Sequence, residues 1–256
     1  AHDMLARRTV LKGAASLPLA AILADPLLSR AAAATLSETA LTTHDGRTVA
    51  GFVAMPEQTP APAMLLIHEW WGLNDQIKAM AGEFAKMGYV AVAADLYDGK
   101  VATDPGNARA YMQQVDAAQA TDTLASWIDW MKAHESVNGK VGTVGWCFGG
   151  GWSLNASIAR PVDATVVYYG NVAREAEALK QLRGPVLGHF AEHDEWINHD
   201  MVRKFEAEMA LAGKEVTSYW YDAQHGFANP TTARYDAQDA MLAWARTQDF
   251  LLANLG

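Results

Sequence analysis

The sequence predicts an α/β protein whose central sheet is mostly parallel and carries helices on both faces. Short apolar segments rich in β-branched residues alternate along the chain with segments whose apolar residues recur at helical spacing. Several of the short segments are continuously apolar, as expected for strands that are covered on both faces. The 256 residues can form one large core, and neither an internal repeat nor a linker indicates a second domain.

The first half of the chain predicts three strands with a helix between the last two. Thr48–Met55 alternates loosely between apolar and polar residues, which favours an outer strand. Continuous apolar runs at Ala63–His68 and Tyr89–Ala94 predict buried strands. Asp75–Met87 has apolar residues at helical spacing, and Gly88 is expected to end that helix.

The second half continues the alternation of helices and strands. A helical region opens at Asp104 or Pro105 and continues through Thr121–Ala133. The apolar, β-branched run Lys140–Val144 then predicts a buried strand, which is followed by the helix Trp152–Ala159. The remaining elements are expected to be strand Ala164–Tyr169, helix Glu175–Leu182, strand Pro185–Phe190, helix Asp200–Ala212, strand Val216–Tyr221 and the long helix Ala233–Ala253.

Six residues, Gly145-Trp146-Cys147-Phe148-Gly149-Gly150, join the strand Lys140–Val144 to the next helix. A Gly-x-nucleophile-x-Gly segment in this context is the nucleophile elbow of α/β-hydrolases, a tight turn that holds the nucleophile above the sheet. Cys147 is therefore the candidate nucleophile, at a helix N-terminus that favours a thiolate and a developing oxyanion. The alternative interpretation is a buried, unreactive cysteine, the usual state of a lone Cys.

A cysteine nucleophile needs a base, and the base needs an orienting acid. Asp194 follows the predicted strand Pro185–Phe190, and His225 follows the strand Val216–Tyr221 within Gln224-His225-Gly226-Phe227. The chain order nucleophile, acid, histidine is that of α/β-hydrolases, and parallel strands bring these loops to one edge of the sheet. The alternatives are a capping or solvated Asp194 and a turn histidine, and two other acids compete with Asp194, namely Glu192 and Glu195.

The chain resembles the dienelactone hydrolase family of α/β-hydrolases from roughly Thr39 to the C-terminus. The resemblance rests on these three residues and on the segment His68-Glu69-Trp70-Trp71-Gly72-Leu73-Asn74. That family uses Cys, Asp and His in this order and carries a glutamate after an early central strand, which corresponds to Glu69. The resemblance implies that Glu69 pairs with the resting thiol of Cys147. A carboxylate there is expected to keep the thiol protonated and protected until substrate arrives.

The resemblance implies hydrolysis of an ester or lactone through an acyl-enzyme, with Cys147 as nucleophile, His225 as base and Asp194 as its orienting acid. The backbone N–H groups of Trp70 and Phe148 are expected to form the oxyanion hole. Two alternatives stay open: a broader carboxylesterase or thioesterase with the same residues, and a non-catalytic ligand-binding protein of the same fold. A redox-sensing role is disfavoured because the chain has no second cysteine.

The sequence departs from the family where the substrate would bind. The family holds its substrate's carboxylate with two arginines, and the corresponding positions here are Gly99, after Asp95-Leu96-Tyr97, and Asn229. Lys100 could supply a point charge but no bidentate contact. Aromatic residues are expected to ring the pocket, although they could instead fill the core, and together they predict a neutral, apolar substrate. The expected substrate-binding residues are Tyr97, Lys100, Trp71, Trp146, Trp196 and Phe227, with Trp70 also on the pocket wall.

Composition disfavours several other classes of function. The net charge is −9 and no basic stripe is present, so nucleic acid is not an expected partner. The histidines His189, His193 and His199 straddle a strand end and a loop instead of sharing a helix face, so no metal is expected. One cysteine excludes an internal disulfide. We expect a small-molecule substrate, no cofactor and a monomer, although the sequence does not fix the oligomeric state.

The N-terminal residues predict an export segment. Arg7-Arg8-Thr9-Val10-Leu11-Lys12 resembles the twin-arginine motif, an apolar stretch follows at Gly13–Leu23, and Ala31–Ala34 suits cleavage by a signal peptidase. The apolar stretch is too short for a stable membrane span. The expectation is a signal peptide at residues 1–34, one hydrolase domain at residues 35–256, and a periplasmic location. The alternative is an ordinary amphipathic N-terminal helix.

Overall fold

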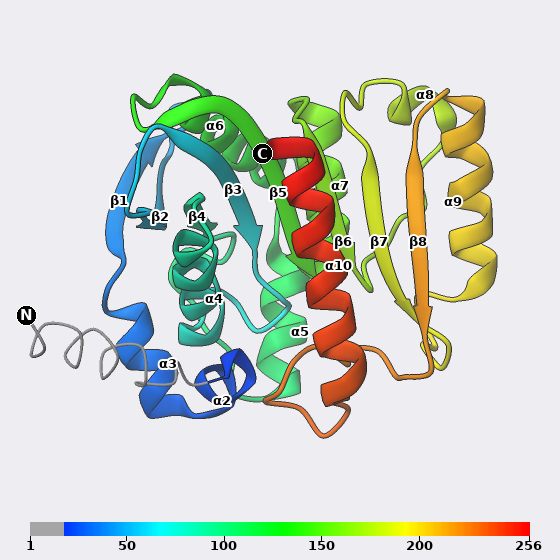
Figure 1. Ribbon diagram of the computed structural model, residues 1–256, viewed down its shortest axis with the longest axis horizontal. Helices are drawn as coiled ribbons and strands as arrows, with labels where there is room; N and C mark the ends of the chain where they lie inside the picture. The colour runs from blue at the N-terminus through cyan, green and yellow to red at the C-terminus, as the bar shows by residue number, and fades with distance from the viewer. Residues whose placement is uncertain (1–17) are drawn as a thin grey trace, which may run out of the picture.

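The computed structural model describes residues 18–256, which form one eight-stranded sheet with helices on both faces (Figure 1). The strands lie in the spatial order β1-β2-β4-β3-β5-β6-β7-β8, with antiparallel pairing only between β1 and β2 and between β2 and β4. Strands β3 to β8 all run parallel to one another. The strands are β1 (Ser37–Thr42), β2 (Thr48–Ala54), β3 (Ala61–Ile67), β4 (Val90–Ala94), β5 (Val137–Trp146), β6 (Ala164–Tyr168), β7 (Val186–Ala191) and β8 (Val216–Tyr221).

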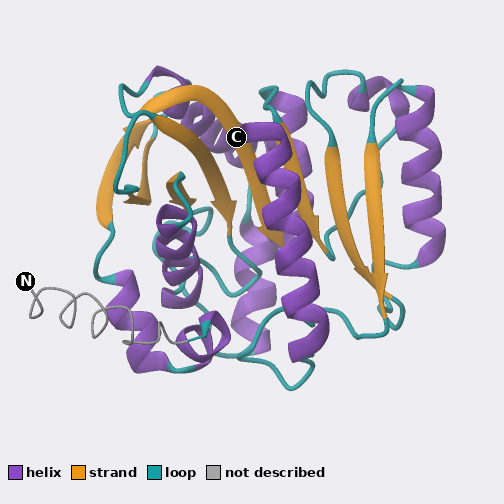
Figure 2. Cartoon of the chain, in the orientation of Figure 1, coloured by secondary structure: helices purple, strands orange, loops and turns teal. Residues whose placement is uncertain are grey.

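Helices α4 and α10 lie in front of the sheet in Figures 1 and 2, and α6 and α7 lie behind it. This arrangement is the mostly parallel α/β sheet with helices on both faces that the alternation of elements predicts. The helices are α2 (Leu19–Ala24), α3 (Pro26–Ala33), α4 (Asp75–Lys86), α5 (Pro105–Gln114), α6 (Ala117–Ala133), α7 (Phe148–Ala159), α8 (Ala176–Leu179), α9 (His199–Leu211) and α10 (Ala237–Leu255).

Strand β3 shows why the central strands read as continuous apolar runs. Met64 and Leu66 pack into the core under α4 and α10, whereas Leu65 and Ile67 pack into the opposite core under α6. All four side chains are fully buried. A strand covered on both faces has no solvent side, so every position is apolar. The two cores hold the carboxyl ends of β3 and β5 rigidly at one edge of the sheet.

The structure departs from the sequence prediction mainly at the periphery. Strand β1 was not expected, and its residues are exposed or only partly buried, so they lack an apolar pattern. Helix α8 covers only Ala176–Leu179 instead of Glu175–Leu182. Helix α7 begins at Phe148, directly after the nucleophile, instead of at Trp152. The predicted start was late because the glycines in the first turn of α7 are poor helix formers.

The chain just before β1 forms two helices that pack on α4. Leu23 of α2 and Ala33 of α3 are buried, and Leu19 and Ile22 pack against the same core cluster. Asp25 caps α3 by accepting from two backbone N–H groups of its first turn. The twin-arginine motif and the start of the apolar stretch lie outside the described residues. Among residues 18–256, none of the helices is long and apolar enough to cross a bilayer.

Candidate active site

Cys147 lies in a strained turn between β5 and α7. Its φ is +56°, a region that few residues other than glycine adopt. A Cβ on Gly145 would lie 1.8 Å from the carbonyl oxygen of Gly149, and a Cβ on Gly149 would lie 2.1 Å from that of Ile67. Glycine is therefore required at both positions, as the motif predicts. The turn directs the partly exposed thiol out of the sheet edge at the N-terminus of α7.

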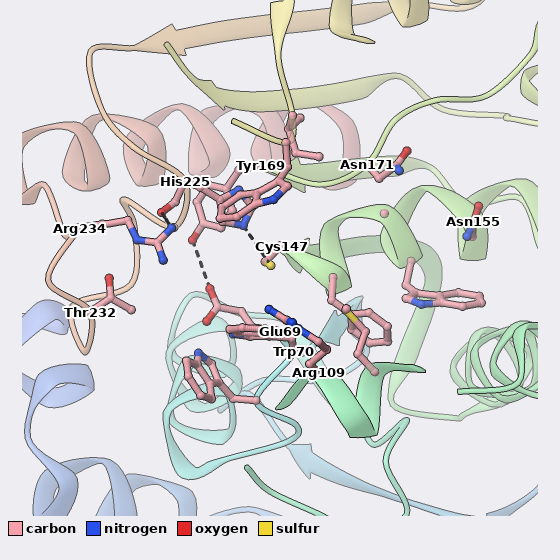
Figure 3. Close-up of a pocket in the computed structure, with 18 of the residues that line it drawn as sticks. Glu69, Trp70, Arg109, Cys147, Asn155, Tyr169, Asn171, His225, Thr232 and Arg234 are labelled. Carbon is pink, nitrogen blue, oxygen red and sulfur yellow. Dashed lines mark hydrogen bonds between the residues drawn. The ribbon is translucent and has the colours of Figure 1, made fainter. Parts of the chain in front are cut away.

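Cys147, His225 and Asp194 form a continuous chain of hydrogen bonds, of which Figure 3 shows the bond between His225 and Cys147. His225 Nε2 lies 3.1 Å from Cys147 Sγ, and Nδ1 lies 2.6 Å from Asp194 Oδ2. The other carboxylate oxygen of Asp194 accepts the backbone N–H groups of Trp196 and Ile197, both at 2.9 Å. His225 thus meets Cys147, and Asp194 meets His225, at the carboxyl edge of the parallel strands.

The neighbouring acids are placed differently. The Asp194 side chain has no exposed surface, whereas Glu192 and Glu195 are exposed. Glu192 forms an ion pair with His199 instead of His225. Burial by itself lowers the pKa of His225, but its hydrogen bonds to Asp194 and Cys147 outweigh burial and raise the pKa to about 10. The site therefore favours an imidazolium beside the sulfur of Cys147.

Glu69 is buried near this chain but is held by other partners. Its carboxylate accepts from Asn229 Nδ2 at 2.7 Å and from the Tyr169 hydroxyl at 3.4 Å. Burial raises the pKa of Glu69 against these hydrogen bonds, which lower it. The Oδ1 of Asn229 is bound in turn by Gln76 and Thr231. Asn229, at a position where the family resemblance implies an arginine, thus anchors Glu69.

The peptide unit between Glu69 and Trp70 is also fixed. Buried His68 lies with Nδ1 2.6 Å from the Glu69 carbonyl oxygen, and its Nε2 accepts the Leu96 N–H at 3.1 Å, which assigns the neutral tautomer. Burial lowers the pKa of His68, which keeps the ring neutral. A planar trans peptide points its N–H opposite to its C=O, so His68 sets the direction of the Trp70 N–H. The ring of Phe148 stacks on His68 with centroids 5.8 Å apart.

A cavity of about 640 Å³ contains Cys147 on its wall (Figure 3). Its apolar lining comes mainly from aromatic residues, and its charged lining comprises three arginines and one carboxylate besides His225. The aromatic residues are Trp70, Trp71, Phe148, Trp152, Tyr169 and Trp196. The arginines are Arg109, Arg174 and Arg234, and the carboxylate is Glu69. A cavity of this size is suited to a small organic ligand.

Four residues that the sequence suggested for substrate binding do not line this cavity. Trp146 and Phe227 are buried in the core, where the residue before the nucleophile and the residue two after the base both turn inward. Tyr97 is buried beneath Phe148 and is only 4% exposed. Lys100 lines a separate cavity of about 430 Å³. Of the expected aromatic wall, the cavity retains Trp70, Trp71 and Trp196.

The histidines considered for a metal site lie apart in separate contacts. His189 is buried and bonds Tyr221 and Thr247. His193 pairs with Asp222, and His199 pairs with Glu192. Within residues 18–256 no group of three His, Cys, Asp or Glu side chains is arranged to hold a metal ion.

Sequence reasoning missed the polar and cationic part of the cavity. Asn155 lies on α7, eight residues after Cys147. Residues four and eight positions after the nucleophile lie on the same helix face, so this spacing is a signal that could have predicted Asn155. Asn171 follows the carboxyl end of β6, the strand beside β5, where the sheet-edge rule places ligand contacts. Arg109 and Arg234 come from α5 and from the loop before α10, and no local pattern marks either of them.

Comparisons with known proteins agree with this geometry. A family model described as the dienelactone hydrolase family matches residues 49–255. The carboxymethylenebutenolidase of Pseudomonas putida is 30% identical, over 81% of this chain and 92% of its own. "Protein usf" of Aquifex pyrophilus is 31% identical, over 80% and 94%.

Solved structures share the fold. A dienelactone hydrolase-like promiscuous phosphotriesterase from metagenomic libraries matches with a TM-score of 0.77 and 22% identity, over 87% of this chain and all of its own. A thermophilic esterase from Thermogutta terrifontis matches with a TM-score of 0.62 and 16% identity, over 86% and 95%. At these identities the likeness concerns the fold alone.

Proposed function

Because the chain belongs to the dienelactone hydrolase family, we propose that it hydrolyses a carboxylic ester or lactone through a thioester on Cys147. The observation that carries the proposal is the hydrogen-bonded chain from Cys147 through His225 to the buried Asp194 on the wall of a small-molecule cavity. Each group has a partner suited to its role, and the base is oriented by an acid that two backbone N–H groups hold in place.

Acylation begins with the thiolate of Cys147 attacking the carbonyl carbon of the substrate. The carbonyl oxygen becomes an oxyanion, which accepts hydrogen bonds from the N–H groups of Trp70 and Phe148. The imidazolium of His225 then donates its Nε2 proton to the leaving alkoxide as the carbon–oxygen bond breaks. An ester yields a free alcohol and an acyl group bound to sulfur, whereas a lactone yields a single ring-opened acyl group that is bound to sulfur and carries the new hydroxyl.

Deacylation uses the same groups, with His225 acting first as a base instead of an acid. His225, now neutral, removes a proton from water, and the hydroxide adds to the thioester carbonyl. The oxyanion occupies the same site, and the carbon–sulfur bond breaks to return the thiolate and release a carboxylic acid. Asp194 stabilises the imidazolium in both stages and fixes Nδ1 as the nitrogen that faces away from the sulfur.

Glu69 is proposed to regulate the ionisation of the thiol when no substrate is present. Its carboxylate is buried in the same cavity, and Asn229 and Tyr169 limit the directions it can face. A negative charge there opposes a second negative charge on Cys147. Substrate that separates the two groups would release this opposition.

A broader carboxylesterase or thioesterase activity would use the same residues, and a substrate screen separates these from a lactonase. Purified protein is assayed with aryl esters, alkyl esters, acyl thioesters and unsaturated lactones, with Cys147→Ala as the blank. We expect turnover only with Cys147 present, while the circular dichroism spectrum of the alanine variant is unchanged. Full activity in Cys147→Ala would contradict the mechanism, and absence of turnover on every substrate would favour a ligand-binding protein.

We also propose that the protein is exported to the periplasm by its twin-arginine segment. The support is the order of basic, apolar and small residues from Arg7 to Ala34. Replacing both Arg7 and Arg8 by Lys should leave the protein in the cytoplasm on cell fractionation. Unchanged distribution of the double variant would contradict this route.

A further inference from the structure

Arg174 lies in the loop after β6 and is fixed entirely by neutral groups. Its Nε donates to Asn155 Oδ1 at 2.8 Å, and its Nη1 donates to the Ala173 carbonyl at 2.7 Å and to Asn171 Oδ1 at 3.4 Å. Among the described residues, no carboxylate forms an ion pair or a hydrogen bond with it. We call Arg174, Asn155 and Asn171 the Arg174 cluster, and all three side chains line the cavity that contains Cys147.

The hydrogen bonds of the Arg174 cluster leave only donors free. A guanidinium can only donate, so both asparagines must turn their oxygens toward it. Their amide nitrogens are left to face other partners, and neither Nδ2 nor Arg174 Nη2 has an acceptor within residues 18–256. Three unfilled donor groups beside a positive charge are complementary to an anionic oxygen group.

The electrostatic setting supports the same ligand. Arg174 is half-buried, and burial lowers the pKa of its guanidinium, as expected for a cation that lacks a nearby counterion. Among residues 18–256, the only carboxylate on the cavity wall is that of Glu69, which Asn229 and Tyr169 already hold. The cavity is thus cationic in a chain whose net charge is −9.

The position of the cluster relative to Cys147 defines the shape of the ligand. Asn155 lies eight residues along α7 from the nucleophile, which is about 12 Å of helix. Phe148 and Trp152, which precede Asn155 on α7, also line the cavity and are apolar. In Figure 3, Asn155 and Asn171 lie on one side of Cys147 and Arg234 lies on the other.

We propose that the Arg174 cluster binds a carboxylate carried by the substrate, separated from the scissile carbonyl by an apolar spacer. The inference rests on the proposed hydrolase function and names a feature of its substrate. It also reverses the expectation of a neutral substrate, which followed from Gly99 and Asn229 at the positions of the family's two arginines. Positive charge is supplied here from a different part of the fold.

The test compares carboxylated and neutral esters of the same length. Aryl hemiesters of a graded series of dicarboxylic acids are assayed beside their aryl methyl diesters at low salt. We expect a higher kcat/KM for the hemiesters, with a maximum at a longer member than the shortest. Arg174→Gln should lower this preference about ten- to hundredfold, mainly through KM, as for loss of one charge-assisted contact. Arg174→Lys should restore part of it.

Two further variants keep the test decisive. Arg203→Gln makes the same change of charge on α9, outside the cavity, and should leave the hemiester preference at its wild-type value. Asn155→Asp supplies an acid to Arg174 without changing size and should also remove the preference. If Arg174→Gln does not fold, Asn155→Asp decides the question alone.

The proposal is overturned if the wild type shows no hemiester preference, or if Arg174→Gln or Asn155→Asp lowers kcat/KM equally for hemiester and diester. Failure of the hydrolase assignment would look different, because the neutral diester would then show no turnover that depends on Cys147.

Discussion

At the scale of single residues, burial and hydrogen bonding select which acid orients the base. Asp194 is one of three acids within four positions, yet it alone is buried and contacts His225. Two backbone N–H groups hold its second oxygen, so the carboxylate cannot rotate away without leaving buried donors unpaired.

We therefore predict that Asp194→Asn lowers kcat about 10³- to 10⁴-fold, because the wrong tautomer of His225 is then favoured. Glu195→Gln, a matched acid-to-amide change on an exposed side chain, should alter kcat by less than about twofold. The measurement is steady-state hydrolysis of an activated ester by both folded variants. A larger loss in Glu195→Gln than in Asp194→Asn would reassign the acid.

The residues of the hydrogen-bonded chain could be named from the sequence because each follows a recognisable strand and Cys147 stands in an elbow motif that fixes their chain order. The cavity wall could not be derived in the same way. Trp146 and Phe227 adjoin catalytic candidates in sequence but turn into the core, and Arg174 reaches the cavity from a loop without periodicity. Which way a side chain points from a loop depends on packing that a single sequence does not display.

At the scale of elements, most strands and helices could be predicted because apolar patterns mark their interiors and particular residues mark their ends. Gly88 and Gly213 follow helices with positive φ, as expected of helix-ending glycines. Asn74 and Asn198 cap α4 and α9 through their side chains. Strand β1 was missed because an edge strand with little burial has no periodic apolar signal.

Helices α2 and α3 are expected to contribute to the stability of the folded domain. Because Leu23 is buried in the core cluster that includes Phe84, and Leu19 and Ile22 pack against it, removing these helices should expose apolar surface on α4. We expect a chain lacking residues 1–34 to unfold at a temperature several degrees below that of a chain lacking residues 1–17, since burial of one leucine contributes about 1.5–3 kcal/mol. Thermal unfolding of the two truncations measures the difference. Equal melting temperatures would mean that both helices are a separable leader.

At the scale of the whole molecule, buried His189 connects the sheet to the C-terminal helix. On β7 it bonds the Tyr221 hydroxyl of β8 at 2.8 Å and Thr247 Oγ1 of α10 at 2.9 Å, and Thr247 also bonds Tyr168 of β6. Burial, with a smaller contribution from Arg246, lowers the pKa of His189 to about 3. The folded protein therefore keeps this ring neutral at pH values where the unfolded chain protonates it.

The direction of the pH effect follows from linkage. The folded pKa lies below the unfolded value of 6.5, so the stability that neutral His189 contributes is fully present above pH 6.5 and is lost as pH falls toward 3. We predict that His189→Gln, although less stable at pH 7, loses less stability on acidification by up to about 1.4 kcal/mol per pH unit. Urea unfolding of both proteins at pH 6.5, 5.5 and 4.5 gives the two slopes. Equal slopes would show that His189 does not contribute to acid unfolding.

At the same scale, we propose that turnover passes through an acyl group on the sulfur of Cys147. The direct measurement is the mass of the protein after rapid acid quench during turnover of a slow ester, followed by peptide mapping. We predict an increase equal to one acyl group, located on the peptide that contains Cys147 and absent from Cys147→Ala. Steady turnover with no acylated Cys147 peptide, together with an alanine variant that retains its kcat, would contradict a thioester on Cys147.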